Sequence, residues 1–171
     1  MILYSIQELS AWIYLKTHGK YFADQKKSLF LYGDGDEYQE GIIAYDWLKN
    51  QYLKRKHIDT PALVWAWQKY NNKTDLFKIK MNKYYPNQAM IKLNVPDNIP
   101  LLSDFDDWNC CLNYGYVGED EQDIDNFYSC CDMMNAKDYN DNVIKSWQRI
   151  FNVHKADIDT VQAVLPYLDL N

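Results

Sequence analysis

The stretch Met90–Asn113, which reads MIKLNVPDNIPLLSDFDDWNCCLN, decides the fold because it joins a strand, a turn and a helix. Apolar side chains nearly alternate with polar ones from Met90 to Val95, which is typical of a half-buried strand. Pro96 and Pro100 then favour a turn, because proline fixes φ and keeps the residue before it out of the helical region. The stretch therefore predicts a strand that ends in a tight change of chain direction.

A short helix is predicted directly after this turn, since three apolar residues have helical spacing: Phe105, Trp108 and Leu112. Ser103 is followed three residues later by Asp106, a pattern that resembles a capping box, and Asp104 would suit the first turn. Two interpretations of this polar cluster remain open. Either Ser103 caps the helix, or Ser103, Asp104 and Asp106 lie at the mouth of a cleft and bind a ligand. The carboxylates lack the spacing of a calcium loop, so no metal site is expected there.

The rest of the chain contains strand and helix patterns that do not alternate strictly. Strand patterns occur at residues 2–4, 63–67, 77–81 and 161–165, and helix patterns at residues 9–18, 40–56, 124–131 and 143–151. Gly19 is expected to end the first helix, and Ser5 with Glu8 resembles a capping box at its start. The chain is predicted to form one compact α+β domain over residues 1–171, with a mixed or antiparallel sheet and three to four helices.

Trp65 and Trp67 stand two residues apart in a predicted central strand, so their side chains lie on the same face of the sheet. They either fill the core or form a stacking surface for a nucleobase or a nicotinamide ring. Gln7 follows the first predicted strand, at the junction with a helix. It is either a surface residue or part of a binding site built at that junction.

Charge is distributed unevenly along the chain, whose net charge is −6. Residues 1–100 carry 14 Lys/Arg and 10 Asp/Glu, whereas residues 101–141 carry one Lys and 11 Asp/Glu. The acidic segment would repel phosphates, so direct binding of duplex nucleic acid is not expected. It is either a solvated surface or a surface that binds a basic protein partner.

Several classes of protein are disfavoured by what the sequence lacks. No apolar run approaches membrane-spanning length and no signal peptide is recognisable, so we expect a cytoplasmic protein without membrane association. The adjacent cysteines at residues 110–111 and 130–131 lack the C-x-x-C spacing of zinc sites. Glycine-rich phosphate loops and hydrolase motifs are absent, and no nucleophile can be paired with a base. Whether the protein is an enzyme therefore stays open.

A set of motifs in this order resembles the bacterial and phage domain-of-unknown-function family DUF3841. The motifs are Tyr4-Ser5-Ile6-Gln7, Tyr45-Asp46-Trp47, Pro61-x-x-x-Trp65-x-Trp67, Leu101-Leu102-Ser103-Asp104-Phe105-Asp106-x-Trp108, Leu112-Asn113, Trp147-x-x-Ile150-Phe151 and Val161-Gln162-Ala163. They cover almost the whole chain, and the run that begins at Leu101 is the most specific. In that family a His often follows the last Trp of this run, where this chain has Asn109. The resemblance implies no activity.

A more distant similarity is to NAD-consuming ADP-ribosyltransferases of the kind that modify DNA. It rests on the opening strand, polar residue and helix, and on Gln162-Ala163 before a late apolar strand. The resemblance implies that a His or Arg holds NAD and that a Glu stabilises the transition state. This chain has Ser5 and Val164 at those positions, and an apolar Val cannot stabilise a developing positive charge. The scaffold would then be shared without the reaction.

Two functions follow as expectations. In the first, a cleft binds a nucleotide-like or NAD-like ligand through Gln7, Trp65, Trp67, Ser103, Asp104, Asp106 and Gln162. The cofactor is unknown, and NAD is the candidate. In the second, the protein is a non-catalytic acidic interaction protein, such as a phage-encoded inhibitor of a host defence nuclease. Its partner would then be a basic protein that contacts residues 119–141.

Overall fold

Five strands form an antiparallel sheet in the order β4-β1-β3-β6-β5. The strands are β1 (Ile2–Glu8), β3 (Val64–Lys69), β4 (Gln88–Asn94), β5 (Leu101–Asp104) and β6 (Val161–Leu165). A second, smaller sheet pairs β2 (Lys20–Tyr21) with β7 (Leu168–Asp169). The computed structural model describes residues 1–33, 38–76, 87–154 and 157–170. The strand predicted at residues 77–81 lies outside these ranges.

Six α-helices occur in the described ranges. They are α1 (Leu9–His18), α2 (Leu29–Tyr32), α3 (Gln39–Lys56), α4 (Phe105–Leu112), α5 (Glu121–Cys130) and α6 (Ala136–Ser146). Three short 3₁₀ segments accompany them at Gln25–Lys27 (η1), Cys131–Met133 (η5) and Trp147–Phe151 (η6). The predicted α+β class is confirmed, with more helices than the three to four expected. No helix in the described part of the chain has the length and apolar character that a membrane crossing requires.

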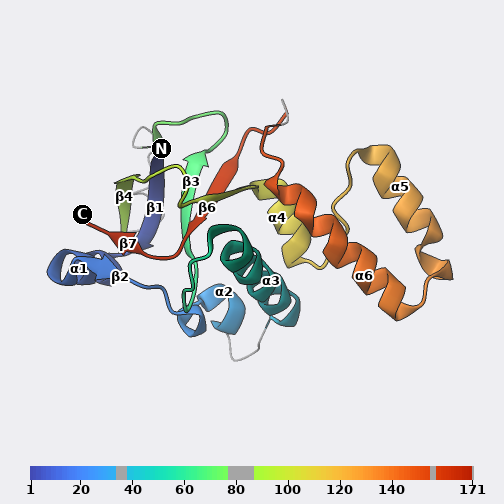
Figure 1. The fold of residues 1–171 in the computed structure, drawn as a ribbon, viewed down its shortest axis with the longest axis horizontal. Coiled ribbons are helices and arrows are strands. Elements are labelled where there is room, and N and C mark those ends of the chain that lie inside the picture. The colour runs from blue at the N-terminus through green and yellow to red at the C-terminus, as the bar shows by residue number, and fades with distance from the viewer. Residues whose placement is uncertain (34–37, 77–86, 155–156, 171) are drawn as a thin grey trace.

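The sheet carries a hydrophobic cluster on each face. On one face, Ala44, Leu48 and Tyr52 of α3 pack with Trp108 of α4 and with Trp147. On the other face, Leu15 of α1 packs with Leu3, Val64 and Ala66. Because successive strand residues point to opposite faces, β6 contributes Val164 to the first cluster and Ala163 and Leu165 to the second. Figure 1 shows α3 beside the sheet, with α4, α6 and α5 progressively farther from it.

The helix caps differ from the prediction at two serines. Ser5 does not cap α1, because β1 continues to Glu8 and the Ser5 hydroxyl donates to the Trp65 carbonyl oxygen at 2.7 Å. Ser103 does not cap α4 either. It lies in β5 opposite Gln162, and Asp104 is the cap, accepting from the backbone N–H groups of residues 106 and 107. β1 is longer than expected and β5 was not predicted, because both strands pair with residues distant in the sequence. The predicted end of α1 at Gly19 is confirmed by its φ of 76°.

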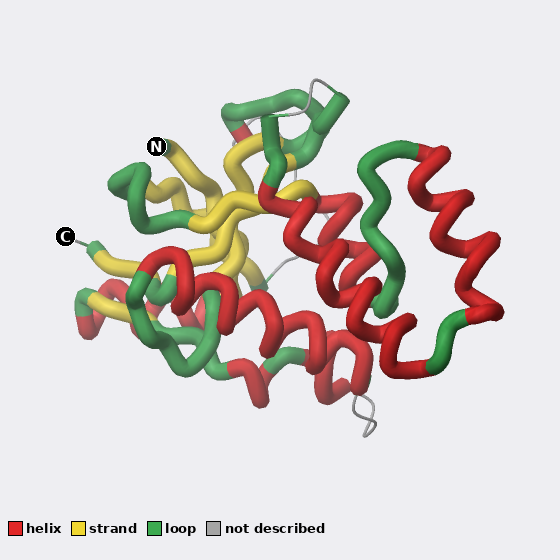
Figure 2. The backbone as a smooth tube through the Cα atoms, turned by 45° about the vertical axis from the view of Figure 1, so that its right-hand side comes forward, coloured by secondary structure: helices red, strands yellow, loops and turns green. Residues whose placement is uncertain are grey.

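Residues 119–141, which we call the acidic arm, contain α5, η5 and the start of α6. Figures 1 and 2 both place α5 at the end of the molecule that is farthest from the sheet. The Tyr116 and Phe127 rings stack at 3.9 Å between centroids and join α5 to the loop before it. This packing leaves three apolar side chains of the arm exposed, namely Ile124, Tyr128 and Met133, of which Met133 is 81% exposed.

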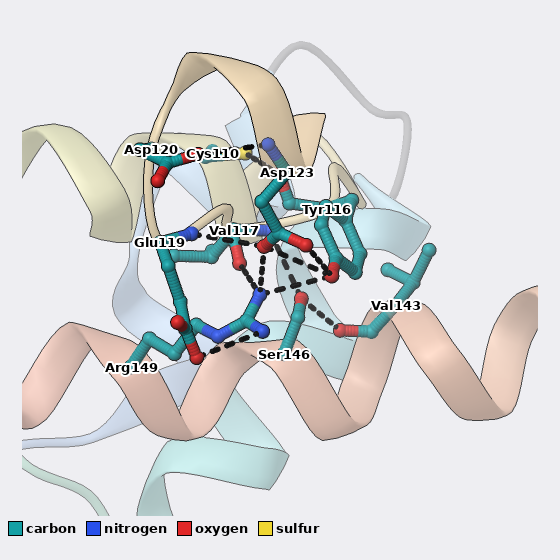
Figure 3. A network of polar contacts seen from close by, with 9 residues as sticks. All are labelled: Cys110, Tyr116, Val117, Glu119, Asp120, Asp123, Val143, Ser146 and Arg149. Atoms are coloured by element: carbon teal, nitrogen blue, oxygen red, sulfur yellow. Dashed lines mark hydrogen bonds and ion pairs between the residues drawn. The ribbon is translucent and has the colours of Figure 1, made fainter. Parts of the chain in front are cut away.

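Arg149 fastens the base of the acidic arm to the body of the protein. Its guanidinium lies 2.9 Å from Asp123 and 3.3 Å from Glu119, and it donates to the Val117 carbonyl oxygen at 2.6 Å (Figure 3). The Tyr116 hydroxyl accepts from the same guanidinium and donates to Asp123. The Glu119 N–H, which donates to Asp123 at 3.0 Å, lowers the pKa of that carboxyl, and the charge of Arg149 adds to the effect. These groups are therefore occupied by structural contacts.

Candidate functional site: two pockets that share Trp65

Strand register brings polar and aromatic side chains together on the face of the sheet that α3 and α4 cover. Trp67 lies opposite Gln162, and Gln162 lies opposite Ser103 on its other side. Directly opposed residues in antiparallel strands point to the same face, so these three form one row. Trp65 belongs to the neighbouring row, opposite Val164. The sheet thus gathers Trp67 of β3, Ser103 of β5 and Gln162 of β6, which lie far apart in the sequence.

Aromatic rings surround a pocket of about 220 Å³ above this row, which we call the aromatic pocket. Its lining includes Phe30, Tyr45, Trp65, Trp67, Phe105 and Trp108, together with the side chains of Asn109 and Gln162. The Trp65 and Trp108 rings lie 5.2 Å apart between centroids, and Trp67 meets Phe105 edge to face at 5.1 Å. Tyr45 contacts Trp65 and Trp108, each at 5.5 Å. Ring contacts of this kind hold each ring in place, so the pocket is largely preformed.

Two buried polar atoms at this place have no hydrogen-bond partner among the described residues: Ser103 Oγ and Gln162 Nε2. Gln162 is 3% exposed and Ser103 is 1% exposed. An unsatisfied buried polar group costs about 1–3 kcal/mol, so native proteins keep few of them without a reason. Gln162 also lines the aromatic pocket, whereas Ser103 does not. The Gln162 amide is therefore a buried, unused hydrogen-bond donor beside this pocket, and a ligand reaches it once the side chain shifts toward the pocket.

Two titratable groups near the aromatic pocket, Tyr45 and Cys111, remain protonated at neutral pH. Burial raises the pKa of Tyr45 to about 12. Burial also raises the pKa of the Cys111 thiol, with smaller contributions from Cys110 and Asp107. A neutral phenol and a neutral thiol are poor nucleophiles, so neither activates covalent chemistry here. In the described ranges, no three His, Cys, Asp or Glu side chains converge so as to hold a metal ion. The arrangement offers aromatic rings and amide groups to a ligand.

A larger pocket of about 670 Å³ adjoins the aromatic pocket, and we call it the Gln7 pocket. Tyr45 and Trp65 line both pockets, so they separate the two spaces. The remaining lining comes from the end of β1, from α1 and from the segment after β2, and it includes Gln7, Glu8, Tyr14, Tyr21, Asp24 and Lys27. Its character is therefore mixed, with aromatic rings beside charged and amide groups.

The Gln7 side chain is held in place from beneath the pocket. Its Nε2 donates to the Ser5 hydroxyl at 2.8 Å, and that hydroxyl donates to the Trp65 carbonyl oxygen at 2.7 Å. Ser5 is fully buried, so this chain of bonds connects the amide to the interior of the sheet. A carboxamide carries two N–H donors and one acceptor oxygen, of which the bond to Ser5 uses one donor. The bond to Ser5 therefore restrains the orientation of an amide whose residue lines the pocket.

The residues predicted as a site are brought together in part. Trp65, Trp67 and Gln162 line the aromatic pocket, while Gln7 and again Trp65 line the Gln7 pocket. Ser103 lies opposite Gln162 but does not line the pocket. Asp104 is engaged as the cap of α4, and Asp106 is exposed in the first turn. Neither carboxylate lines one of the two pockets.

Sequence patterns missed several pocket residues. The sequence patterns place Phe105 and Trp108 on the apolar side of a helix and give Tyr45 no binding role, yet all three line the aromatic pocket. Asn109, which stands where the resembling family often has His, lines it too. A usable signal was the pair of large aromatic residues, Phe105 and Trp108, within the eight residues of α4.

The comparisons with known proteins give one match. The family described as Domain of unknown function (DUF3841) matches residues 2–168. No match was found among curated proteins or among solved structures. The similarity to ADP-ribosyltransferases therefore stays a prediction.

Proposed function

Since the chain belongs to the DUF3841 family, whose description names no activity, we propose a function from the geometry of the site. The aromatic pocket binds the planar nitrogen heterocycle of a small ligand, of the kind found in nucleobases and in nicotinamide. Aromatic side chains stack on such rings irrespective of their substituents, with about 1–3 kcal/mol per base.

The unpartnered Nε2 of Gln162 is the observation that carries this proposal. An amide N–H buried beside an aromatic pocket matches, once its side chain turns toward the ligand, the ring nitrogens and carbonyl oxygens of a heterocycle, which are hydrogen-bond acceptors. A purely hydrocarbon ligand would leave this donor unsatisfied. The pocket volume of about 220 Å³ lies below the roughly 300–1,000 Å³ that is usual for whole drug-sized ligands. The pocket therefore takes a ring, and the remainder of the ligand lies outside it.

A thermal-shift screen tests this proposal, with adenine, uracil, nicotinamide, NAD and ADP-ribose as probes. A ligand at about 100 times its dissociation constant adds about 2.7 kcal/mol to the free energy of unfolding, which raises Tm visibly. Gln162→Leu removes the donor while keeping a side chain of similar length, so it should abolish the shift. Ser103→Ala is the matched control, because it removes the other unpartnered group without altering the pocket lining.

The thermal-shift results that support the proposal differ from those that contradict it. A shift in the wild type and in Ser103→Ala that is absent from Gln162→Leu supports the proposal. A flat response of the wild type to every probe contradicts it. So does a shift that Gln162→Leu retains in full, because the ligand would then bind elsewhere.

We infer a second candidate function from the acidic arm, namely binding of a basic protein surface. Residues 119–141 carry eight Asp/Glu and one Lys, a net charge of −7. Ile124 and Tyr128 are exposed four positions apart on α5, and Met133 is exposed just beyond it. Apolar side chains within a strongly acidic surface complement a basic surface that also has apolar side chains. The DNA-binding face of a defence nuclease has this character.

An inhibition assay with purified bacterial defence nucleases tests the second candidate. Wild-type protein should reduce DNA cleavage, and the double variant Asp125→Lys/Asp132→Lys should not, because like charges would then meet. The control variant Glu40→Lys/Asp157→Lys makes the same charge change outside the arm. Loss of inhibition in both double variants would mean that net charge, not the arm, is responsible. Absence of inhibition by the wild type would remove this candidate.

A further inference from the structure

The Gln7 pocket lies against the same two rings that line the aromatic pocket. Tyr45 and Trp65 contact each other edge to face at 5.5 Å between centroids, and each lines both spaces. Because these rings form the wall between the two pockets, a ligand that spans both must pass around the edge of this wall. The larger pocket, of about 670 Å³, has the volume to hold the substituents of a ring bound in the small pocket.

The polar groups of the Gln7 pocket suit hydroxyl groups. The Gln7 amide is oriented by its bond to Ser5 and offers both a donor and an acceptor. The carboxylates of Glu8 and Asp24 are acceptors, and the Tyr14 ring offers an apolar face. Sugars present this combination, because hydroxyls on their edges form hydrogen bonds and C–H groups on their faces pack on aromatic rings.

The charges of the Gln7 pocket disfavour a phosphate. Two carboxylates, Glu8 and Asp24, line the pocket with one ammonium group, that of Lys27. The negative field is felt within the pocket, since the pKa of Tyr21 is raised by burial and further by the charges of Asp24 and Glu8. Phosphate sites are normally built from Arg or Lys side chains and backbone N–H groups. In the Gln7 pocket, by contrast, the carboxylates outnumber the ammonium groups.

We propose that the ligand is a nucleoside-like molecule, with its heterocycle in the aromatic pocket and an unphosphorylated sugar in the Gln7 pocket. This inference rests on the proposed function, because it assigns the second part of the same ligand. Gln7 is the residue that recognises the sugar, and Glu8 and Asp24 exclude phosphorylated forms.

Isothermal titration calorimetry on the purified chain tests it with two matched series. These are adenine, adenosine and adenosine monophosphate, and uracil, uridine and uridine monophosphate. In the series that binds, the nucleoside should bind about tenfold more tightly than its base, because each further hydrogen bond contributes about 0.5–1.5 kcal/mol. The monophosphate should bind more weakly than the nucleoside, and the difference should shrink as salt is added.

Three variants test which residues determine the affinities for the nucleoside and for the monophosphate. Gln7→Ala should reduce the affinity for the nucleoside to that for the base and leave the base unaffected. Glu8→Gln should bring the monophosphate closer to the nucleoside. Glu40→Gln, which removes an exposed carboxylate outside the pocket, should change neither. The Tm of each variant without ligand shows whether the fold is intact.

Failure of this inference differs from failure of the proposed function. Equal affinity for base and nucleoside, or tighter binding of the monophosphate, overturns the inference while the ring-binding proposal stands. Absence of binding by both bases and both nucleosides overturns ring binding for these classes and the inference with it. Binding that is unchanged in Gln7→Ala overturns the role of Gln7.

Discussion

Gln162 is buried in the interior of the sheet, and its Nε2 has no partner among the described residues. Its neighbours on both sides, Trp67 and Ser103, do not provide one. A residue kept for binding rather than for stability is expected to show this pattern, because natural sequences tolerate a local stability cost at functional sites. Ser5 shows the contrasting case. It is fully buried, yet its hydroxyl both donates to Trp65 and accepts from Gln7.

At this scale we predict that Gln162→Leu stabilises the ligand-free protein. Removal of an unsatisfied buried amide should raise the free energy of unfolding by about 1 kcal/mol, because its desolvation is no longer uncompensated. Urea denaturation followed by tryptophan fluorescence measures the change. Ser5→Ala serves as the comparison and should destabilise, since it leaves the Gln7 amide without its partner. A destabilised Gln162→Leu would show that the amide is satisfied in solution, which contradicts its availability to a ligand.

At the scale of the elements, the acidic arm depends on a few polar contacts at its base. Asp123 accepts from the Glu119 N–H and from the Tyr116 hydroxyl and pairs with Arg149. Asp120 caps α5 by accepting from the Asp123 N–H at 2.8 Å. The arm adds Phe127 to the buried cluster, but most of its other side chains are exposed. Its attachment is therefore sensitive to the charge of Asp123.

We predict that the base of the arm loosens at acidic pH. The Glu119 N–H and Arg149 hold the pKa of Asp123 below its ordinary value of 3.8. A lowered pKa means that the ionised form stabilises the fold, so this contribution is complete above that ordinary value and is lost as the pH falls through the lowered one. The ¹H shift of the Glu119 amide in NMR spectra should follow this titration. In Asp123→Asn the shift should stay constant below pH 4, and a titration that persists there would assign it to another group.

Local sequence patterns predicted most helices and strands, because the residues that produce each pattern lie within the helix or strand itself. The apolar spacing of α3, the apolar run around Trp65 and the glycine after α1 each reflect contacts with near neighbours. The helix caps were missed where pairing with a distant strand decides where a helix begins. Ser103 is an example, because it pairs with β6 and therefore belongs to a strand. The same limit applies to the site. Trp65 and Trp67 could be found as a pair, but their proximity to Gln162 and Trp108 depends on strand order and helix packing, which no local pattern contains.

At the scale of the whole molecule, β6 couples the two faces of the sheet. Val164 belongs to the cluster with α3 and α4, and Ala163 and Leu165 belong to the cluster with α1. All five residues of this strand are buried. A strand shared by two clusters makes it costly to unfold one cluster and keep the other. The prediction that residues 1–171 behave as a single domain follows from this coupling.

We therefore predict one cooperative unfolding transition, although chains of this length often unfold through intermediates. Leu15 and Val143 are fully buried in the separate clusters and report on the two faces. Their methyl signals in NMR spectra should disappear at the same urea concentration. Two distinct midpoints would show that the faces unfold independently.

The position of β6 also has a consequence for synthesis on the ribosome. Strands β3 and β5 are both made before β6, which separates them in the sheet. Until residues 161–165 emerge, each of these strands keeps an edge of unpaired backbone groups. At about 5–20 residues per second, the chain between Asp104 and Val161 takes several seconds to make, during which these edges can pair with other nascent chains. The protein is therefore most prone to aggregate before its sixth strand has been translated.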